Sequence, residues 1–261
     1  MIAGVPTEEF VPPGPEDFEL PPIFEGVEWF TKPVLVASLS VVVVIWFFWT
    51  ASRRSAVVPG RLQFAGELAY NFVRNSIARD QIGSREHMKY VPYLAGVFFF
   101  ILVNNVAASV PFVQFPTFSH VGWAYAIAAM SWLLYNAVGI RKHGFFGYFK
   151  HQTMPSGVPG WLMPLMIPIE FISNILVRPV SLSLRLFANM FAGHILLLVF
   201  VLGGEYMLLH SGSIVLGGIG VLTLLMGLAI AGLELFVQAI QAYIFTVLTA
   251  QYIGSAIAEE H

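Results

Sequence analysis

Residues 181–194, SLSLRLFANMFAGH, place an arginine, Arg185, in the middle of a long and almost wholly apolar segment. The guanidinium of arginine stays protonated under any physiological condition. A charged side chain near the centre of a lipid bilayer costs about 2.5 to 3.5 kcal/mol on insertion scales. Arg185 therefore requires a partner of opposite charge or a wet cavity, and it is the first candidate for a functional residue.

The composition around this segment is that of a membrane protein. Of the 261 residues, 57% are hydrophobic and 11% are charged, whereas about a quarter of the residues of a typical soluble domain are charged. A membrane crossing takes about 20 predominantly apolar residues. Five segments are long enough: residues 33–50, 91–112, 121–140, 162–203 and 213–257. The sequence therefore predicts an all-α polytopic membrane protein with five crossings.

The last two segments are longer than one perpendicular crossing requires. Either each is strongly tilted, or part of each lies along the membrane or projects into water. We favour tilt with a projecting end. Pro179 lies inside the fourth segment and removes one backbone hydrogen bond, which predicts a bend in its cytoplasmic part.

The positions of lysine and arginine predict the orientation. Between the first and second crossings lie Arg53, Arg54, Arg61, Arg74, Arg79, Arg85 and Lys89, and between the third and fourth lie Arg141, Lys142 and Lys150. Loops rich in these residues are typically cytoplasmic. With five crossings, the N-terminus is then outside and the C-terminus is cytoplasmic.

Residues 1–30 are acidic and rich in proline, and they lack the positive n-region of a signal peptide. We expect an extracytoplasmic tail that is solvent-exposed and partly irregular, followed by a single transmembrane helical domain over residues 31–261. Residues 59–89 mix apolar and charged residues at helical spacing, as in an amphipathic helix on the cytoplasmic surface. An ordinary solvated helix and a docking site for a partner both remain open for it.

Polar residues form stripes on the two long segments. At 100° per residue, one face of the fourth segment carries Asn174, Arg178, Ser181, Arg185 and Asn189. His194 lies about half a turn around the helix from Arg185 and points to a different neighbour. A second stripe on the fifth segment carries Glu234, Gln238 and Gln241. A structural ion pair between Arg185 and Glu234 and a path for an ion or solute both remain open.

Several classes of site have no support in the sequence. There is no cysteine, and the seven histidines show no metal-ligand spacing. No phosphate-binding motif is present. We expect no cofactor, no metal, no ATP site and no nucleic-acid partner for this chain.

The runs RPVSLSLRLFANMFAGH (178–194) and QAYIFTVLTAQYIGSAIAEEH (241–261) resemble subunit a of the F-type ATP synthase. Weaker similarity extends to YVPYLAGVFFFILVNNVAASVP (90–111) and PGRLQ (59–63), so the resemblance covers about residues 30–261. It implies a non-catalytic stator subunit of the bacterial plasma membrane. Its partners would be the ring of c subunits, the b subunits of the peripheral stalk, the rest of the complex and lipid.

The resemblance assigns to Arg185 the role of an essential cation that faces the ion-carrying carboxylate of each c subunit. A cation beside a carboxylate lowers the pKa of that acid by about 1 to 3 units, so Arg185 would control proton release and rebinding. Its fixed charge would also separate two offset half-channels. Asn189 and Gln241 match neutral family positions near the arginine, where they can hold water without trapping a proton.

His194 and Glu234 are exchanged relative to many family members, which carry the acid at the first position and the histidine at the second. If the two lie on facing helices, the exchange preserves one acid and one imidazole for a proton relay in the outer half-channel. Which of them takes up protons first stays open, as does a static hydrogen bond that only locks two helices. The imidazole favours protons over sodium ions as the cargo.

Glu170 resembles the family's acidic residue near the cytoplasmic exit, and an interfacial anchor is an equal alternative. Arg178 is better explained as an interfacial charge than as a second stator arginine. Two rival classes stay in view: a proton-coupled secondary transporter, and a structural membrane subunit of a respiratory complex. The internal repeats typical of transporters are not found in the sequence.

Overall fold

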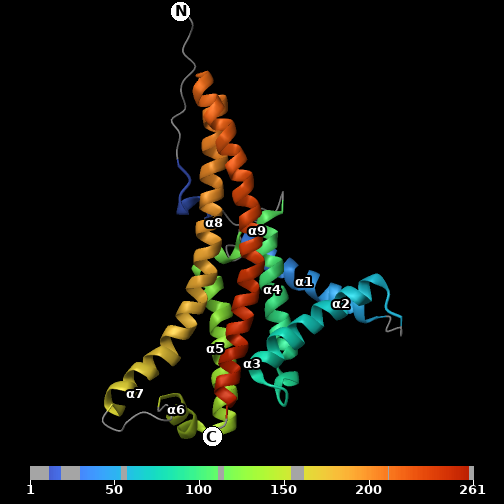
Figure 1. The fold of residues 1–261 in the computed structure, drawn as a ribbon, viewed down its shortest axis with the longest axis vertical. Helices are drawn as coiled ribbons and strands as arrows, with labels where there is room; N and C mark the ends of the chain where they lie inside the picture. The colour runs from blue at the N-terminus through green and yellow to red at the C-terminus, as the bar shows by residue number, and fades with distance from the viewer. Residues whose placement is uncertain are drawn as a thin grey trace, which may run out of the picture.

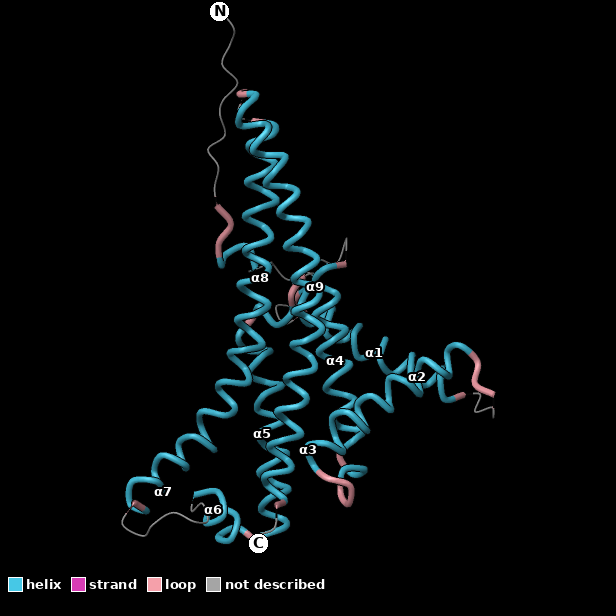
Figure 2. The backbone as a smooth tube through the Cα atoms, viewed as in Figure 1, coloured by secondary structure: helices cyan, strands magenta, loops and turns pink. Residues whose placement is uncertain are grey.

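The computed structural model describes residues 12–18, 30–53, 58–110, 115–153, 162–210 and 212–258. Within these ranges all regular elements are helical (Figure 2). The all-α class predicted from the sequence is therefore confirmed.

Five of the described helical segments are long and apolar enough to cross a membrane. They are α1 (Lys32–Ser52), α4 (Val91–Ser109), α5 (Val121–His143), a continuous run over Met163–Leu209, and α9 (Ile214–Ile257). The fourth consists of α7 (Met163–Ile172), the π-helical turn η5 (Ser173–Val177) and α8 (Arg178–Leu209). The five predicted crossings are confirmed.

Helices α8 and α9 lie side by side over most of their length, and α4 and α5 pack against their lower half (Figure 1). The side chains of Ile101, Leu186, Phe245 and Ile253 are inaccessible to solvent and form the centre of this bundle. The fold thus places the polar residues of α8 beside those of α9.

The fourth and fifth segments contain 47 and 44 residues. At 1.5 Å per residue each is about 65 to 70 Å long, more than twice the thickness of the hydrocarbon core. Their ends near the α8–α9 connection extend beyond the other helices (Figure 1) and expose apolar side chains such as Leu202, Leu222 and Leu225. Tilt with a projecting end stays a prediction for these two segments, and their exposed apolar side chains favour a position within the membrane over one in water.

Two glycines bring α8 and α9 into close contact near their connection. A Cβ atom at Gly220 would lie 2.8 Å from the carbonyl oxygen of Gly204, and one at Gly204 would lie 2.9 Å from Cγ of Leu224. Small residues let helix backbones approach closely in membranes. This packing explains why α8 continues to Leu209, past the predicted end at residue 203.

The bend predicted near Pro179 coincides with the π-helical turn just before it, beyond which α7 diverges from α9 (Figure 1). Proline cannot donate to the carbonyl four residues earlier, which is that of Ile175. In the structure, Nε1 of Trp132 on α5 donates to this oxygen at 3.0 Å. The hydroxyl of Tyr135 donates to the carbonyl of Asn174 at 3.4 Å. Side chains of α5 therefore satisfy the carbonyls that the proline leaves open.

The predicted amphipathic segment forms α2 (Arg61–Asn71), the π-helical η2 (Phe72–Arg79) and α3 (Asp80–Ile82), and it ends at Gly83, whose φ is 94°. Val73 and Ile77 are fully buried in the apolar core that η2 shares with α4. On α2, Leu62, Phe64 and Leu68 are exposed. Phe64 and Leu68 lie one turn apart on the same side of α2, and an exposed apolar pair of this kind favours a helix at the membrane interface over an ordinary solvated helix.

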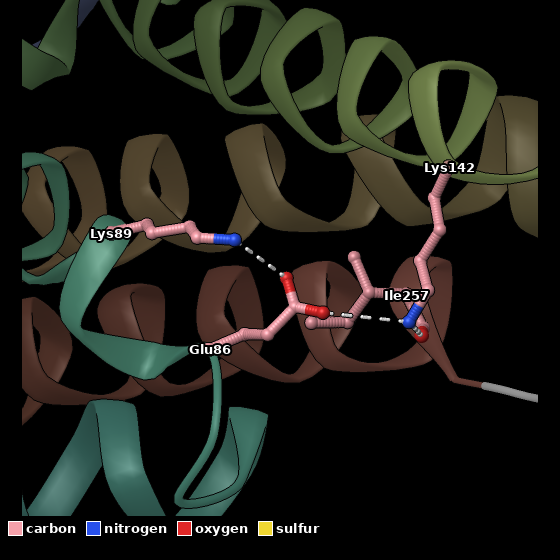
Figure 3. A network of polar contacts seen from close by, with 4 residues as sticks. All are labelled: Glu86, Lys89, Lys142 and Ile257. Carbon is pink, nitrogen blue, oxygen red and sulfur yellow. Dashed lines mark hydrogen bonds and ion pairs between the residues drawn. The ribbon is translucent and has the colours of Figure 1, made fainter.

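A polar cluster ties three segments together at the end of the bundle where α9 terminates (Figure 3). Glu86 precedes the short helix η3 (His87–Lys89) and accepts from Nζ of Lys89 at 3.4 Å, while Nζ of Lys142 on α5 lies 3.6 Å from its other oxygen. Lys142 also donates to the carbonyl of Ile257 at 2.7 Å, one of the last carbonyls of α9. The hydrogen bond and charge of Lys89, followed by the charge of Lys142, hold the pKa of Glu86 below its ordinary value.

The short helix α6 (Phe145–Thr153) follows Gly144, whose φ is 73°. The ring of Tyr148 lies against Gly139 of α5, where a Cβ atom would overlap it. The hydroxyl of Tyr148 donates to Oδ1 of Asn136 at 3.0 Å. These contacts fold α6 back toward α5, beside the start of the fourth segment.

Candidate functional site

Arg185 lies on the wall of an open groove along one side of α8. The groove is otherwise lined by Ile172, Leu176, Val177, Val180, Ser181, Leu184 and Ala188. The arginine side chain is exposed, and it makes no hydrogen bond or ion pair with any of the described residues. An unpaired cation on an apolar membrane helix needs an anion from outside this part of the chain.

The alternative of a structural ion pair between Arg185 and Glu234 is not realised. Glu234 is buried and lies instead beside His194, at 3.6 Å between Oε1 and Nδ1. The reason is geometric, because residues nine apart on a helix point in opposite directions. Glu234 faces the side of α8 that carries His194, whereas Arg185 faces the groove.

Asn189 and Gln241 connect α8 to α9 one turn from Arg185. Nδ2 of Asn189 donates to Oε1 of Gln241 at 2.5 Å. Gln241 is buried, whereas Asn189 is exposed at the edge of the groove. The two neutral residues that the resemblance placed near the arginine are thus in contact with each other.

His194 and Glu234 lie on facing helices, as the exchange of the two residues required. Both side chains are buried, and their separation of 3.6 Å is slightly too long for a hydrogen bond. Nδ1 of His194 and both carboxylate oxygens of Glu234 have no hydrogen-bond partner among the described residues. A small movement or one bridging water would connect the imidazole to the carboxylate.

Gln238 lies one turn along α9 from Glu234 and contacts α4. Nδ2 of Asn105 donates to the Gln238 carbonyl at 3.2 Å, and Oγ of Ser109 donates to its Oε1 at 3.0 Å. Asn104 and Asn105 are both fully buried in an apolar helix. The sequence patterns above assign no role to Asn105 or Ser109, although two adjacent asparagines, Asn104 and Asn105, in an apolar segment are a recognisable signal.

The remaining polar residues of the fourth segment gather near the opposite end of the bundle. Nδ2 of Asn174 donates to Oε2 of Glu170 at 3.2 Å and to the carbonyl of Gln152 in α6 at 2.6 Å. The guanidinium of Arg178 lies over the ring of Tyr252 on α9, 5.0 Å from its centroid. Arg178 is therefore held by an aromatic ring of α9 rather than exposed in the groove.

The predicted stripe is divided by the structure. Arg178 and Asn189 both contact α9, with Ser181 and Arg185 in the groove between them, whereas Asn174 is turned toward α6. The reason is the π-helical turn at Ser173–Val177, which changes the angle per residue just where Asn174 lies.

Comparisons with known proteins agree with this arrangement. A family model described as ATP synthase A chain matches residues 34–254. The chain is 53% identical to the ATP synthase subunit a of a Nocardioides species over 97% of this chain and 95% of the relative. It is 50% identical to that of Pseudarthrobacter chlorophenolicus over 97% and 96% of the two chains, and 39% identical to that of Streptomyces lividans over 97% and 89%. The chain therefore belongs to the ATP synthase subunit a family, the membrane-embedded proton-channel subunits of the Fo stator.

Proposed function

We propose that this chain forms the stationary wall along which a ring of c subunits turns, with Arg185 as the residue that meets each ring carboxylate. The observation that carries the proposal is the exposed guanidinium in an apolar groove of α8, which has no hydrogen-bond or ion-pair partner within the described ranges. An anionic carboxylate arriving from the ring would offset the cost of this cation in the membrane. In return, the cation would lower the pKa of that carboxyl by about 1 to 3 units and release its proton.

The fixed charge also supports a separation of two half-channels. Protons are repelled by the guanidinium, which cannot itself carry a proton away because it never deprotonates at physiological pH. A direct path past Arg185 would therefore be blocked. Protons would have to ride on the ring, and each charge that crosses the membrane would contribute about 2.3 kcal/mol per 100 mV.

The outer half-channel is supported by the buried polar groups between α4, α8 and α9. Ser109 and Asn105 contact Gln238, and Glu234 with His194 lies one turn farther along α9. Buried polar atoms without partners are sites where ordered water binds. We infer that water connects these groups and that His194 and Glu234 exchange a proton before it reaches the ring.

The inner half-channel is supported by the polar residues on the other side of Arg185. Glu170 and Asn174 lie in contact, and Ser181 lines the groove between them and the arginine. Glu170 would receive the proton released near Arg185 and pass it to the cytoplasm. With the Glu170 end of the fourth segment on the cytoplasmic side, the N-terminus is outside and the C-terminus is cytoplasmic. The b subunits and the rest of the complex would be further partners.

The deciding experiment is Arg185→Gln in the whole complex in membrane vesicles. ATP synthesis and ATP-driven proton pumping are expected to fall to background, while the amount of assembled complex is unchanged. Arg61→Gln, an exposed cation on α2, is the matched control and is expected to keep both activities. Coupled synthesis by an assembled Arg185→Gln complex would contradict the proposal, and loss of assembly would favour a structural role.

A further inference from the structure

In the described part of the N-terminal tail, Pro12, Pro15 and Glu16 are exposed, whereas Phe18 is buried. Residues Pro15–Phe18 form a short 3-10 helix, η1, which lies beside α8 (Figure 1). The side chain of Phe18 is 5% exposed. A phenylalanine at this level of burial is part of the packed structure rather than of a solvated tail.

Phe18 packs against the residues that surround the buried histidine. Its ring centroid lies 5.3 Å from that of Phe191 and 5.9 Å from that of His194. Phe191 in turn stacks on Phe187, at 5.2 Å and an interplanar angle of 20°. The tilted contact of Phe18 with the imidazole, at 58°, is a favourable aromatic geometry. Three phenylalanines therefore form an apolar layer next to His194.

This apolar layer lies next to the His194–Glu234 pair, whose facing atoms have no hydrogen-bond partner in the described part of the chain. His194 is 8% exposed and Glu234 is 6% exposed, and no described residue donates to or accepts from the facing atoms of the pair. An apolar ring over the imidazole keeps water and lipid headgroups away from this side. Near the pair, Asn105 and Ser109 of α4 donate to Gln238 of α9. In Figure 1, α4 lies to the right of α9, whereas η1 lies to the left of α8.

We propose that Phe18 is a positioning residue, which holds the N-terminal segment against α8 and closes the His194–Glu234 pair on the side away from α4. Protons then reach His194 along the polar residues of α4 and α9 and not directly past the tail. The proposal rests on the proposed function, because it specifies how the same outer half-channel is bounded.

The first test measures whether Phe18 covers His194. Membranes with the assembled complex are treated with diethyl pyrocarbonate, which acylates neutral imidazole, and modification of His194 is followed by mass spectrometry. In Phe18→Ala the rate is expected to rise about tenfold or more, since a buried group reacts through local opening and each factor of ten corresponds to about 1.4 kcal/mol. Phe18→Leu keeps an apolar cover and is expected to restore the slow rate.

Phe115→Ala is the matched control. Phe115 is 3% exposed and packs on His120 at 5.6 Å between ring centroids, so its truncation removes a comparable buried ring without touching His194. The exposed His210 reports equal delivery of the reagent in all samples. An unchanged His194 rate in an assembled Phe18→Ala complex would overturn the proposal, and so would an equal rise in Phe115→Ala.

A second measurement covers the case in which Phe18→Ala fails to assemble. The chain has no cysteine, so Phe18→Cys with Phe191→Cys places the only cysteine pair in this subunit, and mild oxidation or a short bifunctional reagent is expected to link the two. Absence of the link in assembled complexes would overturn the proposal. Both readouts are independent of the role of Arg185, so a failure of the ring-facing function leaves them interpretable.

Discussion

Nδ2 of Asn189 donates to Oε1 of Gln241 across the α8–α9 interface, one helical turn from the exposed Arg185. Arg178 and Asn189 lie 11 residues apart on α8, and their partners on α9, Tyr252 and Gln241, are also 11 residues apart. Arg178 contacts Tyr252 and Asn189 contacts Gln241, so the two helices are antiparallel. These two contacts fix the register of the helices around Arg185. The amide pair therefore positions the polar surface next to the arginine.

Replacing Gln241 with leucine is expected to disturb this surface without unfolding the subunit. The amide of Asn189 would lose its acceptor beside the groove, and a typical hydrogen bond contributes about 0.5 to 1.5 kcal/mol. ATP-driven proton pumping should fall by about tenfold at unchanged assembly. Gln251→Leu, an exposed amide on the same helix, is the control, and an equal loss in both variants would show that the amide contact is not the cause.

The His194–Glu234 pair predicts the outcome of a residue exchange. His194→Glu alone places two carboxylates on facing helices, and Glu234→His alone places two imidazoles there. Each single variant is expected to lower proton pumping by about tenfold or more, because the pair then lacks either its imidazole or its acid. The double exchange restores one acid and one imidazole at a separation near 3.6 Å. It should pump faster than either single variant, and a double variant slower than both would contradict a relay shared by the pair.

Gly254 permits the contact between α9 and the end of the surface helices. A Cβ atom there would overlap the carbonyl oxygen of Gln81. Gly254→Ala is expected to lower the free energy of unfolding by about 1 to 3 kcal/mol, because backbone atoms cannot yield as a side chain can. Thermal inactivation of the purified complex measures the effect. At Gly96 of α4 no atom lies within 4 Å of the corresponding position, so Gly96→Ala should be neutral or slightly stabilising.

Glu86 predicts a pH dependence of stability. Lys89 and Lys142 lower the pKa of its carboxylate in the folded state from the ordinary value of 4.5. A lowered folded pKa means that the contribution is complete above about pH 4.5 and is lost as the pH falls through the folded value. Between pH 6 and pH 3 the thermal stability of the wild-type complex should therefore fall more steeply than that of Glu86→Gln.

Glu67→Gln on α2 controls for the removal of an exposed carboxylate, one that accepts from Gln63 and has no ion pair among the described residues. This variant is expected to keep the wild-type slope. Added salt should also reduce the difference between Glu86→Gln and wild type, because the ion pairs of Glu86 are partly exposed. A Glu86→Gln complex with the full wild-type slope would mean that other groups carry the acid sensitivity.

The local structure of this chain followed directly from the sequence. Apolar length predicted the five crossings, and the missing N–H of Pro179 predicted a bend where the π-helical turn lies. The end of α8 was predicted at residue 203, six residues before its end at Leu209. In the structure, Gly204 is a point of close contact with α9. Of the predicted stripe, Ser181 and Arg185 line the groove, whereas Asn174, in the π-helical turn, donates to the carbonyl of Gln152 in α6.

The contacts between helices could not be predicted from apolar length or helical periodicity. Helical periodicity gives the direction of a side chain around its own axis but not the register against a neighbour. Only the family resemblance, in which the acid and the histidine are exchanged, indicated that His194 and Glu234 lie next to each other. Nothing in the sequence indicated that Ser109 meets Gln238 or that Phe18 lies on His194.

By itself the sequence determined that this is a helical membrane protein and that one segment carries an obligatory cation, because both depend on the transfer of single residues between water and lipid. The tertiary structure decided which polar groups meet. Close packing at Gly204 and Gly220 and the amide contact of Asn189 with Gln241 set the register of α8 against α9. That register leaves Arg185 facing the groove and buries His194 with Glu234, since packing between distant segments, and not local preference, fixes the neighbours of each side chain.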